Sequence, residues 1–300
     1  MTYPEFNTNP MLFRISFAQR LVLFLCATVL CFVIGSVAIG LIVAIKGQTP
    51  AIMRISAVLQ DIIVFITPAL LTAIISTRLP ARFLAIERKP AASVWIWACL
   101  VLLFSVPAMN ALVMWNESIQ LPSAMREIEE AMRQAEDSAQ ASVGMLLGNG
   151  SIGALIVSIL IVGVLAGLSE ELFFRGAFQR LLSTGGVNTH VAIWLVAFLF
   201  SAMHLQFYGF FGRLVLGAYF GYLLYWSRCL WVPIIVHIFN NTVYILGNHF
   251  SSGTLKGTDI NNVGSENTLL VIISVLFTVL GIVCLRRICI KKTADDYKSC

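Results

Sequence analysis

Two adjacent glutamates, Glu170 and Glu171, are followed by Arg175 in an otherwise apolar stretch of the sequence. Charged side chains are costly at membrane depth and are rare there unless they serve a function. Glu171 and Arg175 are four residues apart with the acid first, which is the favoured order for an ion pair on a helix. Glu170 instead shares its helix face with Gly163 and Gly167, small residues that let another helix come close. We therefore expect Arg175 to neutralise Glu171, and Glu170 to point into a helix bundle with its carboxylate free for chemistry.

Three further polar residues, His204, His237 and Asn241, interrupt later apolar stretches. His237 and Asn241 are four residues apart and so share one helix face. Each of these residues alone would be interpreted as a core residue whose polar atoms are satisfied locally. Together with Glu170, however, they make four buried polar groups, and buried polar groups need partners. We therefore expect the four to meet in one site.

Two chemistries suit this set of side chains. In the first, Glu170 is a general base that activates water, and His204 helps to hold that water. His237 and Asn241 then donate hydrogen bonds to a developing oxyanion. In the second, Glu170, His204 and His237 bind a zinc ion that activates the water. Because the sequence has no HExxH motif, we favour the chemistry without a metal or other cofactor, and Zn²⁺ is the alternative.

Other polar residues near these motifs are not expected to be catalytic. Asp61 interrupts an apolar run close to its start, where a snorkelling or capping role is favoured over a functional one. Ser169 and Ser201 adjoin the motifs, but neither lies in a GxSxG sequence, so we do not expect a serine nucleophile.

The composition indicates the environment that these elements occupy. The chain has 300 residues, of which 58% are hydrophobic and 12% charged, whereas a soluble domain carries about 25% charged residues. Stretches of about 20 apolar residues recur, and each is long enough to cross a bilayer. The net charge of +5 comes from basic residues in short loops, so it indicates orientation in a membrane and not nucleic-acid binding. We expect a multi-pass integral membrane protein whose seven cysteines act as small apolar residues.

The apolar stretches predict an all-α transmembrane bundle of about eight spans. Gly217 and Gly221 are spaced for close helix packing in the sixth of them. A polar, glycine- and serine-rich loop is expected at 248–267. The eight expected spans cover residues 21–45, 55–76, 91–115, 152–180, 191–205, 210–226, 231–246 and 269–285.

Loop charges predict the orientation of the bundle. Residues 78–89 carry four basic side chains and one acidic, a net +3, whereas residues 117–142 carry six acids and two arginines, a net −4. With eight spans, the positive-inside rule then places both termini in the cytoplasm. The acidic segment also shows the periodicity of an amphipathic helix. It lies either on the membrane surface or packs as a connector against the bundle.

The motifs, taken in order, resemble the CPBP family of intramembrane proteases, which includes CAAX prenyl endopeptidases of the Rce1 type and bacterial bacteriocin-processing and immunity (Abi) proteins. The resemblance covers about residues 163–246. The motifs that carry it are Glu170-Glu171-x-x-x-Arg175, Phe200-x-x-x-His204 and His237-x-x-x-Asn241.

The resemblance implies an endopeptidase of a bacterial plasma membrane whose substrate is a peptide or protein. Glu170 and His204 would activate water, and His237 and Asn241 would form the oxyanion hole. Glu171 and Arg175 would support the site. Prenylated substrates belong to the eukaryotic branch of the family, and whether this chain takes a lipidated or membrane-bound substrate is left open by the motifs.

Three regions are expected along the chain: spans one to three with the acidic linker at 1–142, a catalytic core at 143–250, and a loop, last span and basic tail at 251–300. The rival functions are a transporter, since buried Glu and His also form ion pathways, and a silent scaffold or immunity protein. A straight fifth span would place His204 at a different depth from Glu170. We therefore expect that span to start deeper, to tilt or to be broken.

Overall fold

The computed structural model describes residues 15–148, 150–252 and 262–298. Within these ranges the chain is helical and has no β-strand, which confirms the all-α expectation. The first half contains α1 (Phe17–Lys46), α2 (Pro50–Gln60), the π-helical η1 (Asp61–Ile66), α3 (Thr67–Ser76), α4 (Pro80–Phe83), α5 (Ala92–Phe104), α6 (Val106–Glu117), the 3-10 turn η2 (Ser123–Met125) and α7 (Arg126–Leu147). The second half contains α8 (Ile152–Ser158), the π-helical η3 (Ile159–Leu165), α9 (Ala166–Glu171), the π-helical η4 (Leu172–Gln179), α10 (Arg180–Thr184), α11 (Thr189–Ala202), α12 (Phe210–Ser227), α13 (Trp231–Ser252) and α14 (Thr268–Lys298).

A helical segment forms at each of the eight expected places. Among the described residues, four helices are long and apolar enough to cross a membrane, or up to five if the bent pair α5 and α6 counts as one span. The exact number of eight crossings therefore stays a prediction. α13 continues to Ser252, so the loop expected from 248 begins later than its polar composition indicated. Residues 253–261 of that loop lie outside the described residues, as does Cys300.

Prolines account for the irregular places in two of the spans. α5 and α6 are bent by 49° relative to each other at Ser105, and Pro107 lies in the first turn of α6. Pro68 has no N–H to donate to the carbonyl four residues earlier, and the π-helical η1 ends two residues before it, at Ile66. α2, η1 and α3 nevertheless form one continuous span, Pro50–Ser76. Asp61 is thus in the middle of a span and not near its end.

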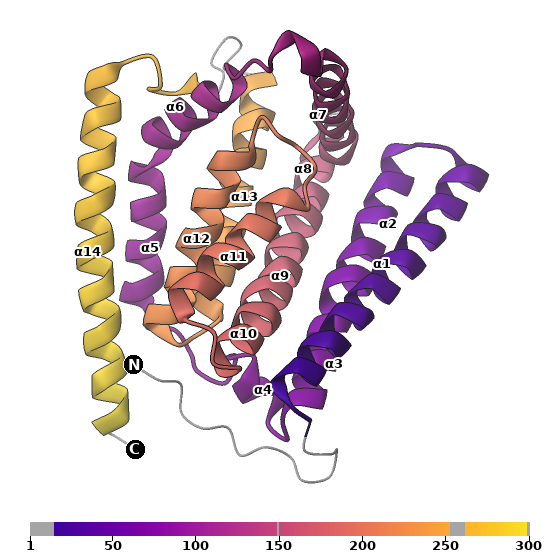
Figure 1. Ribbon diagram of the computed structural model, residues 1–300. Coiled ribbons are helices and arrows are strands. Elements are labelled where there is room, and N and C mark those ends of the chain that lie inside the picture. Colours follow the sequence, from indigo (N-terminus) through magenta and orange to yellow (C-terminus); the bar gives the residue numbers. More distant parts are fainter. Residues whose placement is uncertain (1–14, 149, 253–261, 299–300) are drawn as a thin grey trace.

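The helices form a bundle, and the helices with the most exposed apolar side chains lie on its outside. Figure 1 shows α14 on one side, the hairpin of α1 with α2 and α3 on the other, and α9 to α13 between them. α14 packs on α5, and α11 packs on α12. Apolar side chains along α1 and α14 are largely exposed in the isolated chain, as expected for surfaces that face lipid.

Two glycines on α12 allow the close helix contact that their spacing predicts. A Cβ added to Gly217 would lie 3.1 Å from Phe200, and one added to Gly221 would lie 2.8 Å from Ile193. Phe200 and Ile193 belong to α11, so larger side chains would force the two helices apart. The predicted close packing is confirmed, and it holds α11 against the centre of the bundle.

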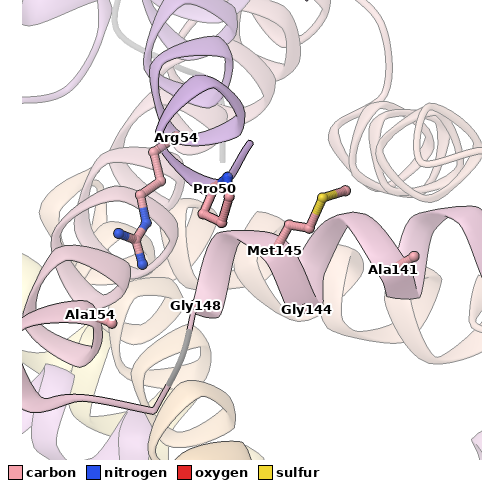
Figure 2. A pocket seen from close by; sticks show the side chains of 7 residues that line it. All are labelled: Pro50, Arg54, Ala141, Gly144, Met145, Gly148 and Ala154. Atoms are coloured by element: carbon pink, nitrogen blue, oxygen red, sulfur yellow. The ribbon is translucent and has the colours of Figure 1, made fainter. Parts of the chain in front are cut away.

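Most of the acidic segment forms α7, which packs on the bundle at its end and near its middle. None of the residues of α7, all of which the structure describes, is buried. The Nε atom of Arg54 on α2 donates to the carbonyl of Leu146, 3.1 Å away, at the end of α7. Figure 2 shows the Arg54 guanidinium lying between Gly148 and Ala154, at the turn from α7 into α8. α7 also contacts the bundle nearer its middle, where Gln206 Nε2 donates to Glu136 Oε1 at 2.9 Å, so it packs as a connector although none of its residues is buried.

Candidate active site

The helix that carries the two glutamates is irregular on both sides of them. The π-helical segments η3 and η4 flank α9, which ends at Glu171. Such segments shift the register of side chains within a helix and occur frequently at functional sites. Sequence periodicity predicts a regular helix here, because it gives no signal for a π-helical turn.

The small-residue face of this helix packs on α13. A Cβ added to Gly167 would lie 3.0 Å from the side chain of Ile238 and 3.1 Å from its backbone nitrogen, and one added to Gly163 would lie 3.2 Å from Thr242. This close approach brings the two helices into register, so that His237 Nε2 lies 3.8 Å from Glu170 Oε2. The prediction that the Glu170 face points into the bundle is confirmed, and its partner is the helix that carries His237.

Glu171 is held by two partners inside the protein. Its Oε1 atom accepts from Arg175 Nη1 at 2.6 Å and from His237 Nδ1 at 2.9 Å. The side chains of Glu171 and Arg175 are fully buried, and His237 is 4% exposed. The predicted ion pair is confirmed. The bond to His237 was not foreseen, and because a carboxylate only accepts, it places a proton on Nδ1 and turns Nε2 toward Glu170.

Arg175 joins three helices around this pair. Its Nη2 donates to the carbonyl of Gly217 on α12, 2.9 Å away. Its guanidinium lies 4.6 Å from the ring centre of Phe200 and 5.4 Å from that of Phe220. Phe220 in turn stacks on His237 with ring centres 4.7 Å apart. Arg175 therefore orders the walls around the histidine as well as balancing the charge of Glu171.

His204 lies just beyond the end of a short helix. α11 has 14 residues and ends at Ala202, and the chain then turns sharply, with Leu205 at a φ of 54°. His204 Nδ1 bonds to the carbonyl of Phe200 at 2.8 Å, so Nδ1 carries the proton and Nε2 is left as an acceptor. His204 lies within electrostatic reach of both Glu170 and His237. The expected span at 191–205 thus ends as a helix at Ala202, and the depth of His204 in a membrane stays a prediction.

A cavity of about 690 Å³ opens beside Glu170. Its walls come from α1, α2 and η1 on one side and from η3 and α9 on the other. Glu170, whose side chain is 17% exposed, and His204 both line it, together with apolar residues of α1 such as Phe32 and Ile39. The Glu170 carboxylate is therefore exposed to this cavity.

Asn241 lies on the same face of α13 as His237, one turn further along. Its Nδ2 donates to the carbonyl of Val162 in η3 at 3.0 Å, and its Oδ1 accepts from Asn240 at 3.3 Å. One of its two amide hydrogens is therefore engaged with the neighbouring helix. The structure brings Glu170, His204 and His237 together and places Asn241 at the edge of this group.

Asp61 is the polar residue that the sequence interpretation placed wrongly. Its side chain is 5% exposed and lines the cavity, so it neither snorkels to the membrane surface nor caps a helix. Its Oδ1 accepts a hydrogen bond of 2.7 Å from the hydroxyl of Ser169, on the helix of the glutamates. The partner is 108 residues away in the sequence, so local patterning gave no signal for the contact.

The arrangement does not form a ready metal site. Across residues 15–148, 150–252 and 262–298, no three side chains of His, Cys, Asp or Glu are grouped as ligands for a metal ion. The zinc alternative requires Glu170, His204 and His237 to converge on one point. With no such group among the described residues, the mechanism below uses protein side chains alone, and the zinc alternative stays a prediction.

Comparison with known proteins locates a family within the chain. Residues 152–243 match the model of the type II CAAX prenyl endopeptidase Rce1-like family. This segment runs from α8 into α13 and agrees with the resemblance expected over residues 163–246. No match was found among curated proteins or among solved structures. Residues 152–243, which hold all seven motif residues from Glu170 to Asn241, are therefore similar to the Rce1-like family, a family known for protease activity.

Proposed function

We propose that the protein is an intramembrane endopeptidase in which Glu170 activates the water that cleaves a peptide bond. The observation that carries this proposal is the different state of the two adjacent glutamates. Glu171 is fully buried and bonded to Arg175 and His237. Glu170 approaches His237 only at 3.8 Å, lines the cavity and keeps its carboxylate oxygens free to accept a proton.

The hydrolysis proceeds in two proton transfers. Glu170 takes a proton from a water molecule that His204 orients through its free Nε2, and the water oxygen bonds to the carbonyl carbon of the peptide. The carbonyl oxygen becomes an oxyanion. When the C–N bond then breaks, Glu170 returns its proton to the leaving amine, so that the carboxylate is restored and one water molecule has been consumed.

The oxyanion is stabilised from α13. His237 donates from Nε2 when the ring carries both protons, and the carboxylates of Glu170 and Glu171 on either side of it compensate the positive charge. Asn241 donates the amide hydrogen that Val162 does not use. The rings packed against His237 and Arg175 exclude water from this side, which strengthens the electrostatic interactions of the site.

The substrate enters as a peptide or protein at the membrane. The wall that α1 contributes to the cavity is largely apolar, which suits a peptide that is lipidated or embedded in the bilayer. The description of the matched family refers to prenylated CAAX substrates. We place the protein in a plasma membrane with both termini in the cytoplasm, on the loop charges of +3 at 78–89 and −4 at 117–142.

A panel of peptides, with and without a prenyl group, tests this function with purified protein in detergent or liposomes. The wild type should cleave at least one peptide, and Glu170→Gln, which keeps the shape but takes no proton, should cleave none while remaining folded. Glu130→Gln on the exposed face of α7 is the matched control and should cleave at the wild-type rate. Cleavage by Glu170→Gln at the wild-type rate would refute the proposal and favour transport.

A further inference from the structure

Three consecutive residues of α9 have three different neighbours. Ser169 is fully buried and bonds to Asp61 on the span of α2, η1 and α3. Glu171 bonds to His237 on α13. Glu170, between them, faces the cavity. The residues on either side of the proposed base are thus tied to two different helices on two sides of the bundle.

Direct partners do not hold the Glu170 side chain in place. Its distance of 3.8 Å from His237 is too long for a hydrogen bond. Its direction therefore depends on the backbone turn that carries it, and the π-helical segments η3 and η4 make the helix irregular on both sides of that turn. The ties made by Ser169 and Glu171 are what fix this turn relative to the cavity.

Asp61 is the stronger of two acceptors for the Ser169 hydroxyl. The Oγ atom lies 2.7 Å from Asp61 Oδ1 and 3.1 Å from the carbonyl of Ala166 in its own helix. A hydroxyl has one hydrogen to donate, and the shorter of the two distances is the one to Asp61. Without Asp61, the hydroxyl would turn back to Ala166, and α9 would lose this tie to η1.

A tie of packing alone would not require a hydrogen-bonding side chain at this place. Asp61 is 5% exposed, lines the same cavity as Glu170 and lies close enough to feel its negative charge. Burying two carboxyl groups near each other is unfavourable. Residues kept in an unfavourable buried arrangement are more common at functional sites than elsewhere.

We propose that Asp61 is a positioning residue for the active site: through Ser169 it sets the turn that aims the Glu170 carboxylate into the cavity. The inference rests on the proposed role of Glu170 as the base. It extends the site beyond residues 152–243, to a helix that the family match does not cover.

Steady-state kinetics separates positioning from a merely structural role. Asp61→Ala and Ser169→Ala should each lower kcat by about tenfold to a hundredfold with KM unchanged, because a misplaced base slows the chemical step. Asp61→Asn keeps the acceptor oxygen, so its kcat should stay within about threefold of the wild type. The kcat of the double variant Asp61→Ala with Ser169→Ala should be no lower than that of the slower single variant, because the two substitutions remove the same hydrogen bond.

Ser158→Ala is the matched control for these variants. Ser158 is a buried serine on the same span as Ser169, and its hydroxyl bonds to the carbonyls of Ala154 and Leu146, far from Glu170 along the helix. Its kcat should equal that of the wild type. A wild-type kcat in Ser169→Ala, or an Asp61→Asn variant as slow as Asp61→Ala, would overturn the proposal.

A second measurement does not depend on peptidase activity. In a Glu170→Cys variant, the rate at which a water-soluble methanethiosulfonate modifies the new thiol reports whether position 170 faces the cavity. Adding Ser169→Ala should slow this labelling by about two- to tenfold, the range that the loss of one hydrogen bond allows. Adding Ser158→Ala should not change it.

The two measurements keep the two claims separate. If Ser169→Ala slows the labelling while the wild type cleaves no peptide, positioning by Asp61 stands and the peptidase function fails. If the labelling rate is unchanged by Ser169→Ala, the positioning proposal is wrong whatever the protein cleaves.

Discussion

Replacing Glu171 with glutamine should destabilise the protein strongly although it removes no volume. Glu171 and Arg175 are fully buried and their bonded atoms are 2.6 Å apart. The variant leaves a charged guanidinium in the interior without its hydrogen-bonded carboxylate. Breaking a buried pair in this way costs about 3–5 kcal/mol. We expect the lower end, about 3 kcal/mol, because Arg175 keeps its bond to Gly217 and its contacts with the rings of Phe200 and Phe220.

This free energy corresponds to a large shift in thermal unfolding. For a chain of this size, each kcal/mol lowers Tm by roughly 2–4 °C, so Glu171→Gln should unfold about 6–12 °C below the wild type. Differential scanning fluorimetry in detergent measures the shift. Glu130→Gln breaks a pair of the same i, i+4 spacing whose side chains are 82% and 57% exposed, so its Tm should move by no more than about 2 °C.

The reasoning depends on the unpaired charge and not on the lost contact. The double variant Glu171→Leu with Arg175→Met replaces both charged groups with apolar ones of similar size. Its Tm should lie closer to that of the wild type than the Tm of Glu171→Leu alone or of Arg175→Met alone. Equal Tm shifts for Glu171→Gln and Glu130→Gln would refute the argument. A wild-type Tm in Glu171→Gln together with lost activity would assign the pair to the catalytic step.

Two further predictions concern the oxyanion and the topology. Asn241→Ala removes one proposed donor and should lower kcat by about 10²–10³ without a change in fold, as measured with any cleaved peptide; a wild-type kcat would remove Asn241 from the oxyanion hole. Ser138 is exposed on α7, so the Ser138→Cys variant should be labelled by an impermeant thiol reagent on intact cells, whereas Lys89→Cys should be labelled only in opened cells. The reverse pattern would contradict cytoplasmic termini.

Contacts within one helix could be predicted from the sequence. The pairing of Glu171 with Arg175 follows from i, i+4 spacing, and the inward face of Glu170 follows from Gly163 and Gly167 at the same periodicity. Both are confirmed by the structure. Their spacing, however, does not say which helix packs on that face, and the assignment to α13 required the three-dimensional structure.

Contacts between helices were the ones that the sequence did not reveal. His237 was expected as an oxyanion donor or, in the alternative, as a zinc ligand, and its bond to Glu171 joins residues 66 positions apart. Asp61 was assigned to the surface because of its place in the apolar run. Its burial depends on a span that begins earlier, at Pro50, and on Ser169 as a distant partner. Hydrophobic periodicity carries no information on either point.

The rate of peptide cleavage after exhaustive chelation tests the central claim most directly. Wild-type protein is dialysed against a strong chelator, its metal content is measured, and its cleavage is compared with that of Glu170→Gln treated in the same way. If Glu170 acts as a general base on water, the metal-free wild type should cleave at its original rate and Glu170→Gln should not cleave. Loss of wild-type activity on chelation, its recovery with added Zn²⁺ and one bound metal ion per chain would contradict this account, and would make Glu170, His204 and His237 ligands instead.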